Sequence, residues 1–120
     1  MTQDNFDHHM FLEMKTLMKD KFAMVLDEYN EDAQSYIHRI KSAMGHSDVE
    51  TVAACAHPLK SSSMALGFIG LGTIAKDIEE TAKGIIHTQD QDLNQLRTRV
   101  DDLDAGYEFV TQQIAAHKTA

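Results

Sequence analysis

A histidine and a lysine stand one helical turn apart in a stretch of very small side chains. The stretch is Ala56-His57-Pro58-Leu59-Lys60-Ser61-Ser62-Ser63. An imidazole near neutral pH is an accessible nucleophile when its neighbours are small, and an ammonium group beside it can stabilise negative charge. These residue types therefore predict a histidine that is presented to another protein and that can carry out covalent chemistry.

The same stretch has the pattern of an amphipathic helix. Helical residues step by about 100°, so that buried positions gather into one stripe. Measured from Val52, the stripe within about 60° is apolar or small, and His57 lies about 140° away. The stripe consists of Val49, Cys55, Ala56, Leu59, Ser63 and Leu66. We expect the helix to bury this stripe and to expose His57, with Lys60 between the two.

These residues resemble the signature of the histidine-containing phosphotransfer (HPt) domain, which runs His-x-x-Lys-Gly-Ser-Ser/Ala and then, after a short gap, Gly-Ala. The matching residues are His57, Lys60, Ser62, Ser63 and Gly67. The order of the expected helices is similar to that of a stand-alone HPt protein. In that family the matching histidine accepts a phosphoryl group on a ring nitrogen, a receiver-domain aspartate donates or takes it, and the matching lysine lies beside the phosphate.

The resemblance implies a histidine phosphotransfer intermediate of a multistep phosphorelay. It makes His57 the phosphoacceptor and gives Lys60 the role of stabilising the phosphoryl charge. It implies response-regulator receiver domains and a hybrid sensor histidine kinase as partners, with Mg²⁺ in the receiver and no cofactor on this chain. The expected supporting residues are Ser61, Ser62 and Gly67, and the expected docking residues are Ala53, Ala54, Met64 and Phe68.

Three residues depart from the family pattern. Ser61 replaces the usual glycine, and we expect its hydroxyl to bond back to the carbonyl of His57, the alternative being a bond to phosphoryl oxygens. Pro58 removes the donor to the carbonyl of Ala54, which predicts a bend beside the histidine. Phe68 replaces alanine, and on a continuous helix it lies within about 20° of His57, where it would touch the partner.

Two other functions stay open at this stage. A module that sequesters a receiver or kinase without carrying phosphate would use His57 only as a contact residue, and the three departures give this alternative some weight. A hydrolytic or acid–base enzyme would use His57 and Lys60, but no paired carboxylate or second base has a suitable spacing, and a convex helix face offers no pocket. Only the relay predicts covalent labelling by a phosphorylated receiver.

No ATP-binding motif accompanies the histidine. The glycines at positions 67, 70 and 72 have the spacing Gly-x-x-Gly-x-Gly and follow no strand pattern, so they predict a connection between helices and no phosphate cradle. We therefore expect a phosphocarrier with phosphotransfer activity and without ATP-dependent autokinase activity.

Composition limits the classes of partner. The chain has 120 residues, 42% of them hydrophobic, and a net charge of −8. This length predicts one domain over residues 1–120, and the negative charge argues against nucleic acid and anionic membranes. No run is apolar enough to span a bilayer, and Met1-Thr2-Gln3-Asp4 lacks the basic start of a secretion signal. We expect a cytoplasmic monomer.

Thiol and metal chemistry find little support. Cys55 is the one cysteine and lies on the apolar stripe, which predicts a buried and inert thiol. No Cys-x-x-Cys or His-x-x-x-His pair exists, so no metal site is predicted.

Apolar residues recur at steps of three and four through most of the chain. Their spacing predicts a helix from Asp7 to Glu28, a second capped by Asn30 and ending at Gly45, and a third opened by a capping box of Ser47 and Glu50. A fourth helix is expected over 71–85 and an unbroken last helix over 93–114. The predicted fold is all-α, an antiparallel up-and-down four-helix bundle with an additional N-terminal helix packed over one end.

Overall fold

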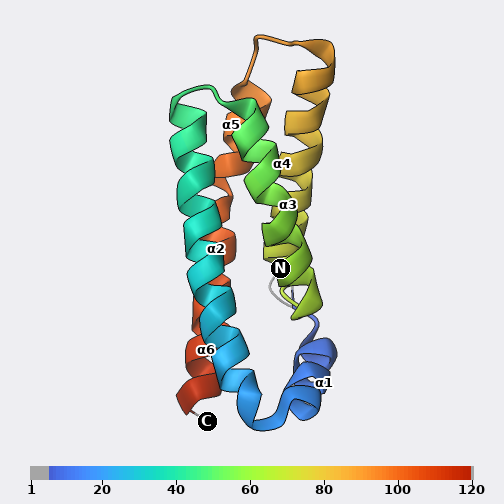
Figure 1. The fold of residues 1–120 in the computed structure, drawn as a ribbon, viewed down its shortest axis with the longest axis vertical. Helices are drawn as coiled ribbons and strands as arrows, with labels where there is room; N and C mark the ends of the chain where they lie inside the picture. Colours follow the sequence, from blue (N-terminus) through green and yellow to red (C-terminus); the bar gives the residue numbers. More distant parts are fainter. Residues whose placement is uncertain (1–5, 120) are drawn as a thin grey trace.

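The structure, a computed structural model, describes residues 6–119, so the N-terminal residues used above to argue against a secretion signal lie outside it. The described residues contain helices and no strand, which confirms the all-α prediction (Figure 1). The helices are α1 (His8–Met18), the short 3₁₀ turn η2 (Lys19–Lys21), α2 (Phe22–Gly45), α3 (Val49–Ala65), α4 (Ile69–Thr88), α5 (Asn94–Asp101) and α6 (Leu103–Thr119).

The long helices form a bundle in which α3 packs against both α2 and α4. Helices α5 and α6 follow one another along the fourth position of the bundle, and α1 lies near one end (Figure 1). Successive long helices are joined at alternating ends of the molecule by short connections. This arrangement places α3 in the middle, where one of its faces is covered and the other is left open.

The predicted stripe of α3 is the covered face. Val52, Cys55, Ala56 and Leu59 are all buried, as the spacing of apolar residues predicts. Ser63 is also buried, and its hydroxyl lies 2.7 Å from the hydroxyl of Tyr29 on α2. Because a buried hydroxyl needs a partner, this pair explains how a serine is accommodated in the core.

The connection between α3 and α4 is bound to the start of α1. The amide of Asp7 donates to the carbonyl of Gly67 at 2.7 Å, and the Asp7 carboxylate caps α1 by accepting from the amide of Met10. Gly67 has a φ of +86°, a conformation that glycine adopts without steric cost. Phe6 stacks on Phe68, with ring centroids 5.5 Å apart, and so joins the beginning of the chain to the start of α4.

Two predicted helix boundaries are wrong. The first break comes at Lys19–Lys21, and α2 continues through Asn30, whose side chain accepts a hydrogen bond from the hydroxyl of Tyr107. The cap of α3 is Asp48, which accepts from the amide of Thr51, because Ser47 takes a φ of +55° and lies outside the helix. Both predictions relied on local capping preferences. At Asn30 a contact with the distant Tyr107 competes with capping, whereas at Ser47 the neighbouring Asp48 takes the cap.

The last predicted helix is interrupted. Asp102 separates α5 from α6, and its amide bonds to the carbonyl of Arg99, three residues earlier. The apolar residues that recur at steps of three and four in this segment are nevertheless buried at Leu96, Val100, Leu103, Val110 and Ile114. None of the described helices is long and apolar enough to cross a membrane.

Candidate functional site

His57 lies on the open side of α3, at the edge that faces α4. Its side chain is 60% exposed, whereas the residue before it, Ala56, is fully buried. The helix therefore holds the backbone of His57 firmly while the ring projects toward solvent. Pro58 lies inside α3, which is assigned as one helix from Val49 to Ala65.

A buried carboxylate on α4 holds the histidine ring. Oε2 of Glu79 lies 2.8 Å from Nδ1 of His57, and the Glu79 side chain is only 4% exposed. Glu79 belongs to the buried face of α4, which otherwise consists of Leu71, Gly72, Ala75, Ile78 and Ala82. This residue was missed in the sequence analysis, although a charged residue on an apolar stripe is the signal that could have identified it.

Two lysines complete the surroundings of Glu79. Nζ of Lys60 on α3 lies 2.8 Å from Oε1, and Nζ of Lys83 on α4 lies 2.9 Å from Oε2. Burial raises the pKa of the Glu79 carboxyl, but the hydrogen bonds from Lys60, Lys83 and His57 outweigh it and lower the pKa to about 2. The carboxylate is therefore ionised at neutral pH in spite of its burial.

This geometry decides which ring nitrogen of His57 can react. An ionised carboxylate only accepts hydrogen bonds, so Nδ1 of His57 must carry a hydrogen. In the neutral ring, the lone pair then belongs to Nε2, because Nδ1 is the nitrogen bound to Glu79. The site is thus an exposed imidazole held at Nδ1, with its nucleophilic nitrogen directed away from the carboxylate and two ammonium groups nearby.

The comparison with protein families identifies the architecture around this histidine. The family model for the Hpt domain matches residues 24–106, which include His57, Lys60 and Glu79. The chain belongs to the Hpt domain family. Proteins of this family have a histidine phosphotransfer role in phosphorelays, as the resemblance at His57 and Lys60 predicts.

The fold of this Hpt domain is also found in a solved structure. It is similar to the crystal structure of histidine-containing phosphotransfer protein B (HptB) from Pseudomonas aeruginosa PAO1, with a TM-score of 0.86 and 17% sequence identity. The match covers 96% of this chain and 95% of the other. No curated protein sequence shows significant similarity to the chain.

The serines of the Hpt motif have different surroundings. Ser61 is exposed, and the described part of the chain contains no hydrogen bond from its hydroxyl to His57. The back-bond predicted for Ser61 is formed by its neighbour, since the hydroxyl of Ser62 lies 2.9 Å from the carbonyl of Pro58. Pro58 has no amide hydrogen to donate within the helix. Its carbonyl, however, accepts a hydrogen bond from the Ser62 hydroxyl.

The predicted docking residues do not form one surface. Ala54 is exposed and Met64 is partly exposed, but Ala53 is buried. The expectation that Phe68 lies beside His57 is wrong, because α3 ends at Ala65 and Phe68 is fully buried between Tyr29 and Phe6. The prediction assumed a continuous helix, whereas the turn at Gly67 directs the Phe68 ring into the core.

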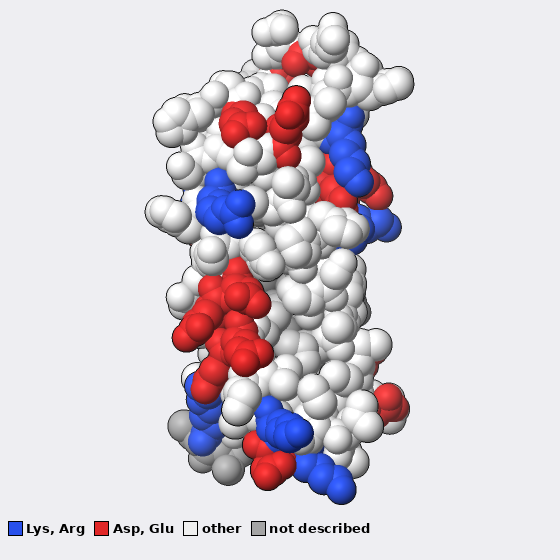
Figure 2. Space-filling model, in the orientation of Figure 1, with Lys and Arg blue, Asp and Glu red and all other residues white. Residues whose placement is uncertain are grey.

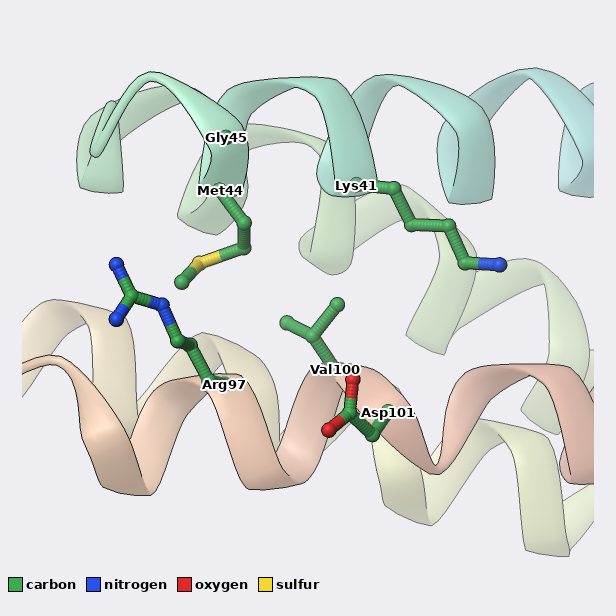
Figure 3. Close-up of a pocket in the computed structure, with 6 residues that line it drawn as sticks. All are labelled: Lys41, Met44, Gly45, Arg97, Val100 and Asp101. Carbon is green, nitrogen blue, oxygen red and sulfur yellow. The ribbon is translucent and has the colours of Figure 1, made fainter.

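A shallow pocket lies apart from these residues, between the end of α2 and α5 (Figure 3). Its lining comes from Lys41, Met44, Gly45, Arg97, Val100 and Asp101. The pocket has two cationic side chains, Lys41 and Arg97, and Lys41 already forms an ion pair with Asp104 of α6. Among residues 6–119, no group of three histidine, cysteine or acidic side chains is arranged to hold a metal ion.

Proposed function

We propose that His57 is the phosphoryl carrier of a multistep phosphorelay, accepting the group from an aspartyl phosphate on one receiver domain and passing it to another. The observation that carries this proposal is the geometry of the ring, which is bound at Nδ1 by Glu79 and 60% exposed. Membership of the Hpt domain family supports the same role. In this proposal both the phosphoryl donor and the phosphoryl acceptor are proteins, and ATP is not a substrate of this chain.

The chemistry is one displacement at phosphorus that runs in either direction. The lone pair of Nε2 attacks the phosphorus atom of the aspartyl phosphate, the P–O bond breaks, and its electron pair returns to the aspartate carboxylate. In the onward step, a carboxylate oxygen of the second receiver attacks the phosphorus atom, and the electron pair of the N–P bond returns to Nε2. In-line transfer of this kind depends mainly on positioning and charge stabilisation.

Lys60 supplies charge stabilisation from this chain. Its ammonium group is held by Glu79 one turn from His57 and is 29% exposed, so one or two of its donors can face a phosphoryl oxygen. Ser61 is the small exposed residue that lets a partner approach, and Ser62 and Gly67 maintain the local backbone. The Mg²⁺ ion of the reaction belongs to the aspartate pocket of the receiver.

The docking surface consists of the exposed residues around the ring, chiefly Ala54, Ser61 and Met64 with the lysines. Basic residues at this surface suit a receiver whose reactive pocket is acidic. Acidic side chains gather elsewhere, over α2, which carries exposed Asp27, Glu28, Glu31 and Asp32 (Figure 2). The charge distribution therefore favours docking of the receiver on the α3–α4 side. The proposed phosphorelay role also includes a hybrid sensor histidine kinase among the partners.

The molecular form that fits this role is a single Hpt domain over residues 1–120, acting as a cytoplasmic monomer. We assign it an antiparallel up-and-down bundle with α1 packed over one end. The alternating connections in Figure 1 and the hydrogen bond between Asp7 and Gly67 support this description.

The test is transfer from phosphorylated receiver domains to the purified protein. We expect an acid-labile, alkali-stable phosphoryl group on the wild type, none on His57→Gln, and normal labelling of His87→Gln, a control for another exposed histidine. Detectable binding of several receivers without labelling would instead support a module that sequesters receivers.

A further inference from the structure

We propose that the backbone carbonyl of Ala54 accepts a hydrogen bond from a docked receiver domain, and that it is available to do so because Pro58 has no amide hydrogen. The inference rests on the proposed function, since it concerns how a receiver binds to the face that carries His57. Pro58 is in this view a specificity-determining residue. It acts through the Ala54 carbonyl and does not touch the reacting atoms.

The carbonyl of Ala54 lies inside a helix but cannot receive the usual helical donor. In an α-helix each carbonyl accepts from the amide four residues later, which for Ala54 is residue 58. That residue is a proline, and α3 continues on both sides of it, from Val49 to Ala65. The acceptor therefore belongs to the middle of a regular element, where its position is better fixed than at a helix end.

Nearby side chains do not replace the missing donor. The hydroxyl of Ser62 bonds to the carbonyl of Pro58 at 2.9 Å, and Nδ1 of His57 bonds to Glu79. Among the described residues, no side chain donates to the carbonyl of Ala54. Ala54 is exposed, so water solvates this acceptor in the free protein and a partner can displace the water.

The acceptor and the nearest ammonium group lie on opposite sides of the histidine. Ala54 lies about 60° around α3 from His57 in one direction, and Lys60 lies about 60° away in the other. Because Lys60 binds Glu79 of α4, its side is the one that faces α4. A receiver that covers the exposed ring therefore meets cations on the α4 side and a backbone acceptor on the other side.

This acceptor defines the chemistry of the group that it binds. A carbonyl oxygen only accepts hydrogen bonds, so the receiver must present a backbone N–H, a hydroxyl or an ammonium group beside its aspartate pocket. A receiver with a carboxylate or carbonyl at this place would bury two acceptors against each other, which is unfavourable. The Ala54 carbonyl thus discriminates among receivers, whereas the lysines attract any acidic pocket.

Two replacements of Pro58 separate the carbonyl from the proline ring. Pro58→Ala supplies an amide that bonds to the Ala54 carbonyl and so removes the acceptor from the surface. The matched control replaces Pro58 by lactic acid, which has the methyl group of alanine but forms an ester in place of the amide between residues 57 and 58. Both replacements remove the ring, and only alanine supplies a donor.

Receiver binding and labelling by a small donor are measured on the same three proteins. A receiver that binds the wild type should bind Pro58→Ala about three- to tenfold more weakly and the lactic acid variant as tightly as the wild type. Phosphoramidate phosphorylates histidine without a docking surface, and it should label His57 equally in all three. The ¹³C resonance of the Ala54 carbonyl, detected through the amide of Cys55, should shift when the receiver is added to the wild type.

Equal receiver affinity of the wild type and Pro58→Ala would overturn the inference. Equally weak binding by both variants would also overturn it, because the effect would then come from the proline ring. A parallel fall in labelling by phosphoramidate and by receivers would overturn it in favour of a tilted histidine ring.

The carbonyl resonance decides the question even if the lactic acid variant does not fold. An unshifted Ala54 resonance in the wild type saturated with receiver would contradict a hydrogen bond at this carbonyl. Failure of the proposed function has a different signature, since receivers would then bind without labelling His57. The comparison of affinities would still support or overturn the role of the carbonyl in that case.

Discussion

The Nδ1 atom of His57 on α3 lies 2.8 Å from Oε2 of Glu79 on α4, 22 residues further along the chain. This contact makes one nitrogen of the ring a hydrogen-bond donor and leaves the lone pair of the neutral ring on the other. It also connects the histidine to Lys60 and Lys83 through a single buried carboxylate. The Hpt site of this protein is therefore a four-residue cluster shared by two packed helices.

Removing the ammonium group beside the histidine should impair transfer. In Lys60→Ala the phosphoryl oxygens lose a charge-assisted hydrogen bond, and we expect transfer to slow and phosphohistidine lifetime to shorten, each about tenfold. Rapid-quench transfer from a phosphorylated receiver measures the first effect, and loss of label from the isolated protein measures the second. Lys76→Ala removes an exposed lysine from α4 and serves as the control. Unchanged rates and lifetime in Lys60→Ala would exclude the assigned role.

The depressed pKa of Glu79 predicts how stability depends on pH. Its pKa is about 2 in the folded protein and near 4.5 when the chain is unfolded, so the unfolded state binds a proton first as the pH falls. The stabilisation is fully present above about pH 4.5 and is lost as the pH falls toward 2. We expect a contribution of about 2 to 3 kcal/mol, reported by denaturant unfolding of the wild type and Glu79→Gln. A difference between them that does not shrink below pH 4.5 would contradict this prediction.

Truncating Phe68 should damage the fold and not the docking surface. Phe68 is fully buried and stacks with Tyr29, at a centroid separation of 5.4 Å. We expect Phe68→Ala to lower the free energy of unfolding by about 3 to 5 kcal/mol. Met64→Ala is the comparison, because Met64 is partly exposed and should mainly weaken receiver binding. Chemical denaturation and receiver titration separate the two effects, and a stable Phe68→Ala with weakened binding would restore the surface role.

Gly67 should be sensitive to the smallest side chain. A Cβ atom at this residue would lie 2.4 Å from the carbonyl oxygen of Asp7, and its φ is +86°. We expect Gly67→Ala to destabilise the protein by about 1 to 3 kcal/mol, with early loss of amide protection in α1. Gly84→Ala is the matched control, since nothing lies within 4 Å of its Cβ position and alanine favours helix by about 0.5 to 1 kcal/mol. Equal stability of the two variants would refute the prediction.

Pro58 tests whether a bend beside the histidine matters. Pro58→Ala restores an amide donor inside α3, and we expect the free energy of unfolding to rise by about 2 kcal/mol. If a bend tilts the imidazole outward, the same variant transfers phosphoryl groups more slowly. The rate of phosphoryl transfer from one phosphorylated receiver is measured for both proteins in reactions quenched at successive times. Equal rates would count against any functional role of Pro58.

The exposure of His57 and the burial of the α3 stripe could be predicted because they depend on short-range periodicity. Residues at steps of three and four share a face of any helix, so the burial of Val52, Ala56 and Leu59 follows from spacing alone. Lys60 beside the histidine follows from the same geometry. The fold class was accessible for the same reason, since the apolar pattern persists from Phe11 to Ile114.

Breaks between helices were harder to predict because capping residues express only local preferences. Asn30 has a strong preference for a cap, yet it lies within α2 and binds Tyr107. The predicted surface position of Phe68 is wrong because the direction of its side chain depends on the turn at Gly67. The carbonyl of Gly67 in this turn accepts a hydrogen bond from the amide of Asp7. In both cases a contact with a distant segment decides the local conformation.

His57, Lys60 and the small residues around them were determined by the sequence itself, because one helical turn brings them together. The partner of the ring was decided only by tertiary structure. Glu79 is 22 residues away and meets His57 because the apolar faces of α3 and α4 pack together and carry the carboxylate under the imidazole. Spacing along the chain determines which residues share one helix face, whereas the packing of two helices determines which faces meet.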